Sequence, residues 1–319
     1  MDPVSLFSLF GIVRGTSPVA NLVVFQENET MEIYKLKDKI VEVWAAARII
    51  VRRYGHTKKF AKHLVALVIR QYENFKDVKL VEFLGHDPIG KTLGYRKKPN
   101  STTFSKVRER MDPQMMEDLQ LWLVSGLLKG KQIRLLAQDS TDVPAYSEKD
   151  KDARWGHRTP SRKEQLLYKS NKDKTKEFFY GYKPHMIVDA ETETPIAVIV
   201  VPANTNDKKF FDPLYEKTKK IAVLQYFAKF LAYAQYHSSK IRTRLRNDGI
   251  TPVIPFSGNR WQKTESPRDP EYGKRWAVER VFARLKGVFC LEENRFFGLK
   301  KVKIHVFSCV IAYLMRYKM

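Results

Sequence analysis

The spacing of apolar residues changes near residue 131, and this change limits the possible folds of the chain more than any other feature of its sequence. In MEIYKLKDKIVEVWAAARIIVRRY (31–54) and KKFAKHLVALVIRQYENF (58–75), apolar residues recur every three to four positions, which predicts helices. From 131 onward, short β-branched and aromatic runs alternate with helical patterns, which predicts strands between helices. The chain therefore divides into a helical part, residues 1–130, and a mixed α/β part, residues 131–319.

The α/β part predicts one mixed sheet with helices packed on it. IRLLA reads as a buried strand that stops at Asp139, and FFYGYKPHMIVDA and PIAVIVVPAN form a hairpin around ETET. YFAKFLAYA is either a further strand or the edge of a helix, and TPVIPF is a short strand. Helices are predicted at 208–224, 238–249, 272–286 and 302–317.

Three stretches lack a periodic apolar pattern. Residues 1–30 are expected to form a loose or capping segment. Residues 86–102 and 147–176 are rich in turn-forming or polar residues and are predicted as loops.

The net charge of +23 indicates a polyanionic partner. Lysines and arginines are spread along the whole chain, and such a surface attracts nucleic acid. A membrane is the competing partner, but no stretch reaches the roughly 18 uncharged apolar residues of a spanning helix. MDPVSLFSLFGIV has no positively charged segment before its apolar run, so we expect no secretory signal. The expected location is the cytoplasm.

A stripe of polar residues runs along one side of the predicted helix YGKRWAVERVFARLK (272–286). At about 100° per residue, Tyr272, Arg275, Glu279 and Lys286 fall within a narrow sector, and the apolar residues fall elsewhere. A stripe of this kind is usually a solvated face with weak ion pairs. It can also present a carboxylate and two cations to a ligand.

Asp139 is a candidate catalytic residue because it lies where a buried strand ends. A turn or capping aspartate is the alternative. Glu279 is a second carboxylate from a distant segment. Carboxylates that converge from separate elements can hold paired Mg²⁺ ions for phosphoryl transfer, and Arg275 and Lys286 would then contact phosphate.

Four motifs in order resemble the DDE-type transposases of insertion sequences. The spacing of Tyr272, Arg275, Glu279 and Lys286 resembles the signature around the catalytic Glu of that family. AQDSTDVPA, which contains Asp139, resembles its first-Asp strand, and GYKPHMIVDAETETPIAVIVVPANTND resembles its central hairpin. LGYRKKPNSTTFSKVRERM resembles its N-terminal segment. The resemblance as a whole runs from about residue 55 to the end.

The resemblance implies an RNase H-like catalytic core, preceded by a helical, basic DNA-binding region at residues 1–130. It implies that Asp139 and Glu279 are catalytic and bind metal, two Mg²⁺ or Mn²⁺ ions if the enzyme is active. Tyr272, Arg275 and Lys286 are then expected to contact DNA phosphates. The implied partners are double-stranded DNA, as terminal inverted repeats and target, and a second copy of the chain when DNA is bound. The implied location is the nucleoid of a prokaryote.

The sequence departs from the family at the second catalytic Asp. The family pattern is Leu-Ala-Asp-x-Gly-Tyr-Asp-Ser, whereas this chain reads LAYAQYHSS. Tyr233 therefore occupies the Asp position, Gln235 the Gly position and His237 the later Asp position. A phenol that ionises near pH 10 is a poor Mg²⁺ ligand. Either this copy is inactive, or a nearby group substitutes, for which the candidates are Asp142, Asp207 and His237.

Three functions are compatible with these features. The chain is an active transposase, an inactive or repurposed transposase that only binds DNA, or a general nucleic-acid-binding protein. The ordered motifs argue against the third function. We expect impaired catalysis, because Mg²⁺ requires strict ligand geometry.

Overall fold

The computed structural model describes residues 18–100, 102–158, 177–256 and 269–319. The chain divides into two compact units, residues 1–42 and 43–319. The described part of the first unit belongs to helix α1 (Pro18–Arg53). The expected loose segment at 1–30 is therefore wrong for residues 18–30, which are helical, while residues 1–17 lie outside the described residues.

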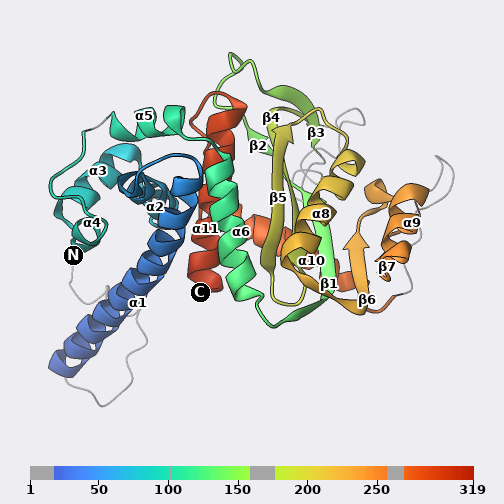
Figure 1. The fold of residues 1–319 in the computed structure, drawn as a ribbon, viewed down its shortest axis with the longest axis horizontal. Helices are drawn as coiled ribbons and strands as arrows, with labels where there is room; N and C mark the ends of the chain where they lie inside the picture. The colour runs from blue at the N-terminus through green and yellow to red at the C-terminus, as the bar shows by residue number, and fades with distance from the viewer. Residues whose placement is uncertain (1–17, 101, 159–176, 257–268) are drawn as a thin grey trace, which may run out of the picture. The chain divides into compact units, whose positions relative to one another are not determined.

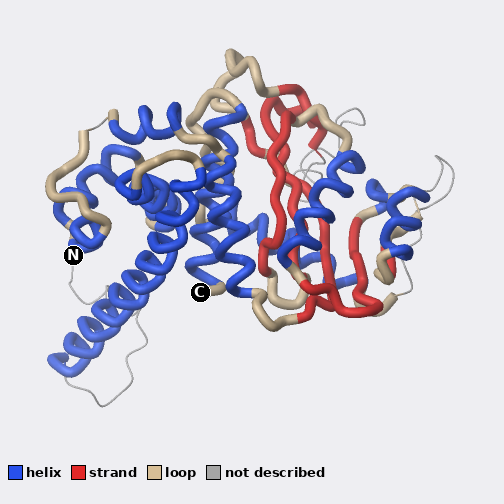
Figure 2. Tube along the Cα trace, viewed as in Figure 1, coloured by secondary structure: helices blue, strands red, loops and turns tan. Residues whose placement is uncertain are grey.

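The described residues before 130 form helices and their connections, as the apolar spacing predicts (Figure 2). After α1 come α2 (Lys58–Tyr72), α3 (Asp77–His86), α4 (Pro88–Thr92), α5 (Thr103–Arg110) and α6 (Gln114–Leu127). The prediction of a loop at 86–102 is wrong for residues Pro88–Thr92, which form the short helix α4. Asp87 caps this helix by accepting the Ile89 backbone N–H at 2.7 Å, and Pro88 fixes the first helical φ.

Within the described residues, seven strands form one mixed sheet (Figure 1). They are β1 (Gln132–Ser140), β2 (Val143–Pro144), β3 (Arg154–Arg158), β4 (Glu177–Asp189), β5 (Thr194–Pro202), β6 (Val223–Ala232) and β7 (Thr251–Val253). β5, β4 and β1 are antiparallel neighbours, and β6 and β7 continue the sheet parallel to β1. This arrangement confirms the RNase H-like mixed sheet, and it shows that residues 226–232 of YFAKFLAYA belong to strand β6.

β3 corrects the predicted loop at 147–176. The strand is five residues long, and its register pairs Trp155 with Tyr180 and His157 with Phe178 on β4. Its side chains are mostly exposed, so it lacks the apolar run that marks a buried strand. Residues 159–176 of that predicted loop lie outside the described residues.

Helices cover both faces of the sheet. Leu135, Leu136 and Ala137 are all fully buried, and successive residues of a strand point to opposite faces. The covering helices include α8 (Phe211–Ile221), which contacts β4 and β5, and α10 (Trp276–Gly287), which contacts β1 and β4. α9 (Ser239–Asn247) packs against β7.

The C-terminal helix α11 (Leu299–Tyr317) joins the sheet to the preceding helices. It contacts β5, α2 and α6, and every residue from Ile304 to Met315 is buried. In Figure 1, α6 and α11 lie side by side next to β5. Helix α11, from after residue 130, packs against α2 and α6, from before it. The domain boundary at residue 130 therefore stays a prediction.

The predicted helix at 272–286 is corrected in its first turn. Residues Tyr272–Arg275 form a 3₁₀ turn, η4, and the α-helix begins at Trp276. Within the described part of the chain, none of the helices is long and apolar enough to cross a membrane.

Candidate active site

Strand pairing brings Asp139 and Tyr233 to one edge of the sheet. β1 and β6 are parallel, and Gln138 lies opposite Ala232 in their register. Asp139 and Tyr233 are the next residues along the two segments. Because parallel strands end at the same edge, the two side chains emerge side by side.

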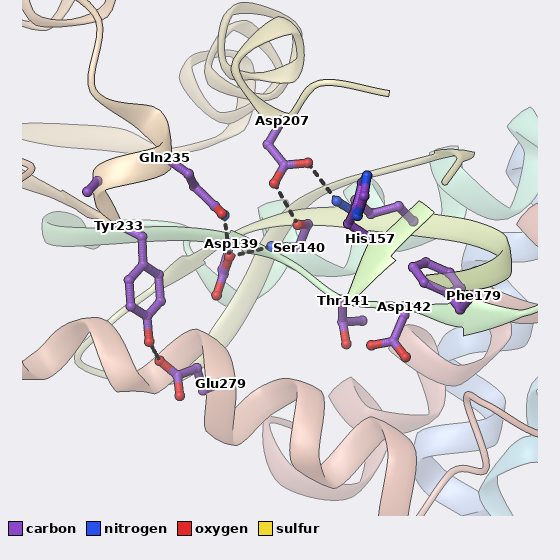
Figure 3. A pocket seen from close by; sticks show the side chains of 12 residues that line it. Asp139, Ser140, Thr141, Asp142, His157, Phe179, Asp207, Tyr233, Gln235 and Glu279 are labelled. Atoms are coloured by element: carbon purple, nitrogen blue, oxygen red, sulfur yellow. Dashed lines mark hydrogen bonds and ion pairs between the residues drawn. The ribbon is translucent and has the colours of Figure 1, made fainter. Parts of the chain in front are cut away.

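Glu279 reaches the same place from α10, which packs against β1. Asp139, Tyr233 and Glu279 line one pocket of about 530 Å³ (Figure 3). The remaining lining residues are Ser140, Thr141, Asp142, His157, Phe179, Lys183, Asp207, Ala234 and Gln235. The structure thus brings together the two carboxylates predicted to be catalytic, although 140 positions separate them in sequence.

Tyr233 and Arg275 both donate to Glu279. The Tyr233 hydroxyl donates to Oε1 of Glu279, and Arg275 Nη2 donates to the same oxygen at 3.4 Å. The Arg275 guanidinium carbon also lies 3.5 Å from the ring centroid of Tyr233 and 4.8 Å from that of Tyr272. Burial, followed by the hydrogen bond to Glu279, raises the pKa of Tyr233, so its phenol is neutral. One oxygen of Glu279 therefore has two donors from the protein itself.

Arg275 is buried, with 5% of its surface exposed. The polar stripe is therefore not a solvated face at this position. Lys286 is also engaged, with its Nζ 3.1 Å from Asp142 Oδ1 and 2.6 Å from Glu292 Oε1. The predicted phosphate contacts of Tyr272, Arg275 and Lys286 stay predictions.

Asp139 is held in the strand-end turn. Its Oδ1 accepts the Ser140 backbone N–H at 2.8 Å and Gln235 Nε2 at 3.3 Å. Burial is the main cause that raises the pKa of Asp139 to about 7, and the charges of Glu279 and Asp207 add to it against the opposing Ser140 hydrogen bond. Asp139 is thus protonated in part of the molecules at neutral pH.

Asp207 is a third carboxylate in the pocket, and a cation already neutralises it. Lys183 Nζ donates to its Oδ1 at 3.1 Å, and Ser140 Oγ donates to its Oδ2 at 3.4 Å. His185 lies 4.0 Å from the same carboxylate, but burial lowers its pKa to about 4, so it is neutral. The His185 ring stacks on Phe210 at a centroid distance of 4.7 Å.

These side chains do not fit a paired Mg²⁺ site. In the part of the chain that the structure describes, no three His, Cys, Asp or Glu side chains are arranged to hold a metal ion. The donor chemistry gives the reason: Glu279 already has two donors, Asp207 is paired with Lys183, and Tyr233 presents a hydroxyl proton. Mg²⁺ requires several anionic or neutral oxygen ligands in octahedral geometry.

Lys183 and His157 are among the members of the pocket that the sequence motifs did not predict. Lys183 lies in the hairpin motif GYKPH and offers no local signal that its side chain meets Asp207. His157 lies on β3, in the stretch predicted as a loop. The alternation of aromatic and small residues in RWGHR was the available signal for a strand.

Comparison with known proteins places the chain in a family. The family model of the transposase DDE domain matches residues 130–315. No curated protein matches the chain. Among solved structures, the chain is similar to the piggyBac transposase, determined by cryo-EM in a synaptic complex with hairpin DNA, with 11% sequence identity and a TM-score of 0.35. That similarity covers 88% of this chain and 72% of the other. Since the family match spans more than half of the sequence, the chain belongs to the DDE-domain transposases.

Proposed function

We propose that this transposase binds DNA at transposon ends, and that Tyr233 impairs the Mg²⁺-dependent nicking and strand transfer expected of its family. The observation that carries the proposal is the hydrogen bond from the Tyr233 hydroxyl to Glu279. The resemblance expects a third carboxylate at position 233. The chain instead has Tyr233 there, whose hydroxyl donates a hydrogen bond to the carboxylate of Glu279. A metal ion that binds Oε1 of Glu279 has to displace both Tyr233 and Arg275.

A basic cleft in the helical part supports the DNA-binding half of the proposal. The cleft has a volume of about 840 Å³. Its lining cations are Arg48, Lys58, Lys59, Lys62, Arg96, Lys97 and Lys98. Among the described residues that line it, none is acidic. This cleft is the part of residues 1–130 that we propose contacts the DNA backbone.

Among the described residues, few acidic side chains compensate the charge of the cleft. Lys98 has a long contact of 3.9 Å with Glu82, and Lys62 lies 4.3 Å from the ring centroid of Tyr95. Burial and the neighbouring charge of Lys59 lower the pKa of Lys62. Cations that repel one another in this way gain stability when phosphate neutralises them and counterions are released.

The polar stripe supplies a second proposed contact with DNA. Lys286 is partly exposed, and a DNA phosphate can replace Asp142 or Glu292 as its partner. Arg275 can reach phosphate only by leaving Glu279. Since transposition pairs two ends, we expect at least a dimer on DNA.

The test is a comparison of binding and nicking by the natural chain. The substrate is DNA that carries the inverted repeats flanking its gene, incubated with Mg²⁺ or Mn²⁺. We expect salt-sensitive binding with little or no nicking. Tyr233→Asp should raise nicking, and the triple change Tyr233→Asp, Gln235→Gly, His237→Asp should raise it further by restoring the family turn. Tyr233→Asn is the matched control, since it has the size of Asp without the charge.

Robust nicking by the natural chain would contradict the impairment. In that case Asp142→Ala, Asp207→Ala and His237→Ala, made singly, would identify the residue that completes the site. Absence of DNA binding at low salt would contradict the function as a whole.

A further inference from the structure

Four aromatic rings form a ladder on one face of the β3–β4 ribbon. The ladder consists of Trp155 and His157 on β3 and of Phe178 and Tyr180 on β4. Trp155 lies opposite Tyr180 with ring centroids 5.4 Å apart, and His157 lies opposite Phe178 with centroids 4.3 Å apart. Residues paired in register, and residues two apart on a strand, share a face of a sheet.

The ladder is exposed although it is largely apolar. Trp155 is 56% exposed and Phe178 is 61% exposed. Adjacent exposed aromatic rings of this size indicate a binding surface, because folding alone would favour burying them.

The other face of the ribbon explains why the ladder points outward. A side chain at Gly156 would come within 2.6 Å of Ala203 Cβ, so this face of β3 lies directly against the segment after β5. Tyr180 is anchored as well, since its hydroxyl donates to the Asp150 carbonyl at 2.6 Å. The rings are therefore presented by a paired and anchored strand ribbon, which lowers the entropy lost on binding.

The ladder begins at the wall of the active-site pocket. His157 lines that pocket and contacts Phe178, and Phe179, the next residue on β4, lines the pocket too (Figure 3). A DNA strand that reaches the pocket would thus have flat aromatic surfaces directly beside it.

We infer that the aromatic ladder is a stacking surface for unpaired bases of the DNA strand that enters the pocket. This inference rests on the proposed function. Bases carry π faces that stack on Trp, Phe, Tyr and His side chains, and a duplex hides these faces until bases unpair. The net charge of +23 favours a nucleic acid over an apolar protein segment as the occupant.

The experiment compares two fluorescent probes: a blunt duplex, and the same duplex with an unpaired extension of thymines. Stacking of one base contributes about 1–3 kcal/mol, so the natural chain should bind the extended probe roughly 5- to 150-fold more tightly. Trp155→Ala should remove most of this preference and leave affinity for the blunt duplex unchanged. Trp155→Phe should keep most of it.

Trp122→Ala is the matched control, because Trp122 is also exposed, at 41%, but lies on α6. It should keep the preference. Phe178→Ala gives an independent reading from the neighbouring strand, and circular dichroism checks that each variant folds.

Four outcomes would overturn the inference. If the natural chain binds both probes with equal affinity, the ladder is not a stacking surface, although the proposed function still holds. A preference that persists in both Trp155→Ala and Phe178→Ala places the stacking elsewhere. Loss of self-association in Trp155→Ala, with the preference unchanged, assigns the ladder to a contact between copies of the chain. Failure of both probes to bind the natural chain overturns the proposed function together with the inference.

Discussion

Replacing Tyr233 by Asp should make the stability of the protein depend on divalent metal. Without metal, the change removes a hydrogen bond to a charged acceptor, worth about 1.5–3 kcal/mol, and the contact of Arg275 with the ring, worth about 1–2 kcal/mol. Glu279 is 34% exposed, and Arg275 keeps its contact with Tyr272, so the lower ends apply. The free energy of unfolding should therefore fall by about 2–3 kcal/mol.

Metal should restore part of that loss only in the Tyr233→Asp variant. The carboxylate that this substitution introduces repels Asp139 and Glu279, and a bound cation relieves the repulsion. With free metal at about ten times its Kd, binding returns about 1.4 kcal/mol. The melting temperature should rise by about 2–4 °C.

The assay is thermal unfolding of the natural chain, Tyr233→Asp and Tyr233→Asn in EDTA and in increasing Mn²⁺ or Mg²⁺. The natural chain and Tyr233→Asn should show no metal response beyond a common background. The reasoning fails if the natural chain is stabilised by metal as much as Tyr233→Asp. It also fails if Tyr233→Asp responds no more than Tyr233→Asn.

Two further predictions concern charge. Lys59→Ala and Lys97→Ala should each reduce the slope of log affinity for DNA against log salt concentration by about 1. Lys219→Ala is the control and should leave the slope unchanged, because Glu216 and Asp248 pair with that lysine. Equal slopes in all three variants would show that the basic cleft does not contact DNA. Burial lowers the pKa of His305 from 6.5 to about 4. At acidic pH the imidazole therefore binds a proton more readily in the unfolded chain than in the folded one. The stability that the neutral, buried His305 contributes is complete above pH 6.5 and is lost as the pH falls towards 4. Urea unfolding at about pH 6.5 and about pH 4.5 should show a loss that is about 2–3 kcal/mol smaller in His305→Gln than in the natural chain, and identical losses would contradict the assignment.

Local patterns predicted the elements that are long or well buried. The buried strand ending at Asp139, the hairpin of β4 and β5, and the terminal helix α11 each carry a continuous apolar signal, because burial selects apolar residues at the period of the element. β3 and the short helix α4 carry no such signal. β3 exposes its side chains, and α4 depends on the capping contact of Asp87 with Ile89.

The fold class, the two candidate carboxylates Asp139 and Glu279, and the departure at Tyr233 could be predicted from the sequence, because each is visible in a local motif. Tertiary structure decided what these residues do to one another. Tyr233 and Glu279 are 46 positions apart, and their hydrogen bond exists because β6 lies parallel to β1 while α10 packs against β1. The same packing buries Arg275 close to two tyrosine rings, where it is a partner of Glu279 rather than part of a solvated stripe. Strand register and helix packing bring distant segments together, and the period of a single segment contains no information about its partner.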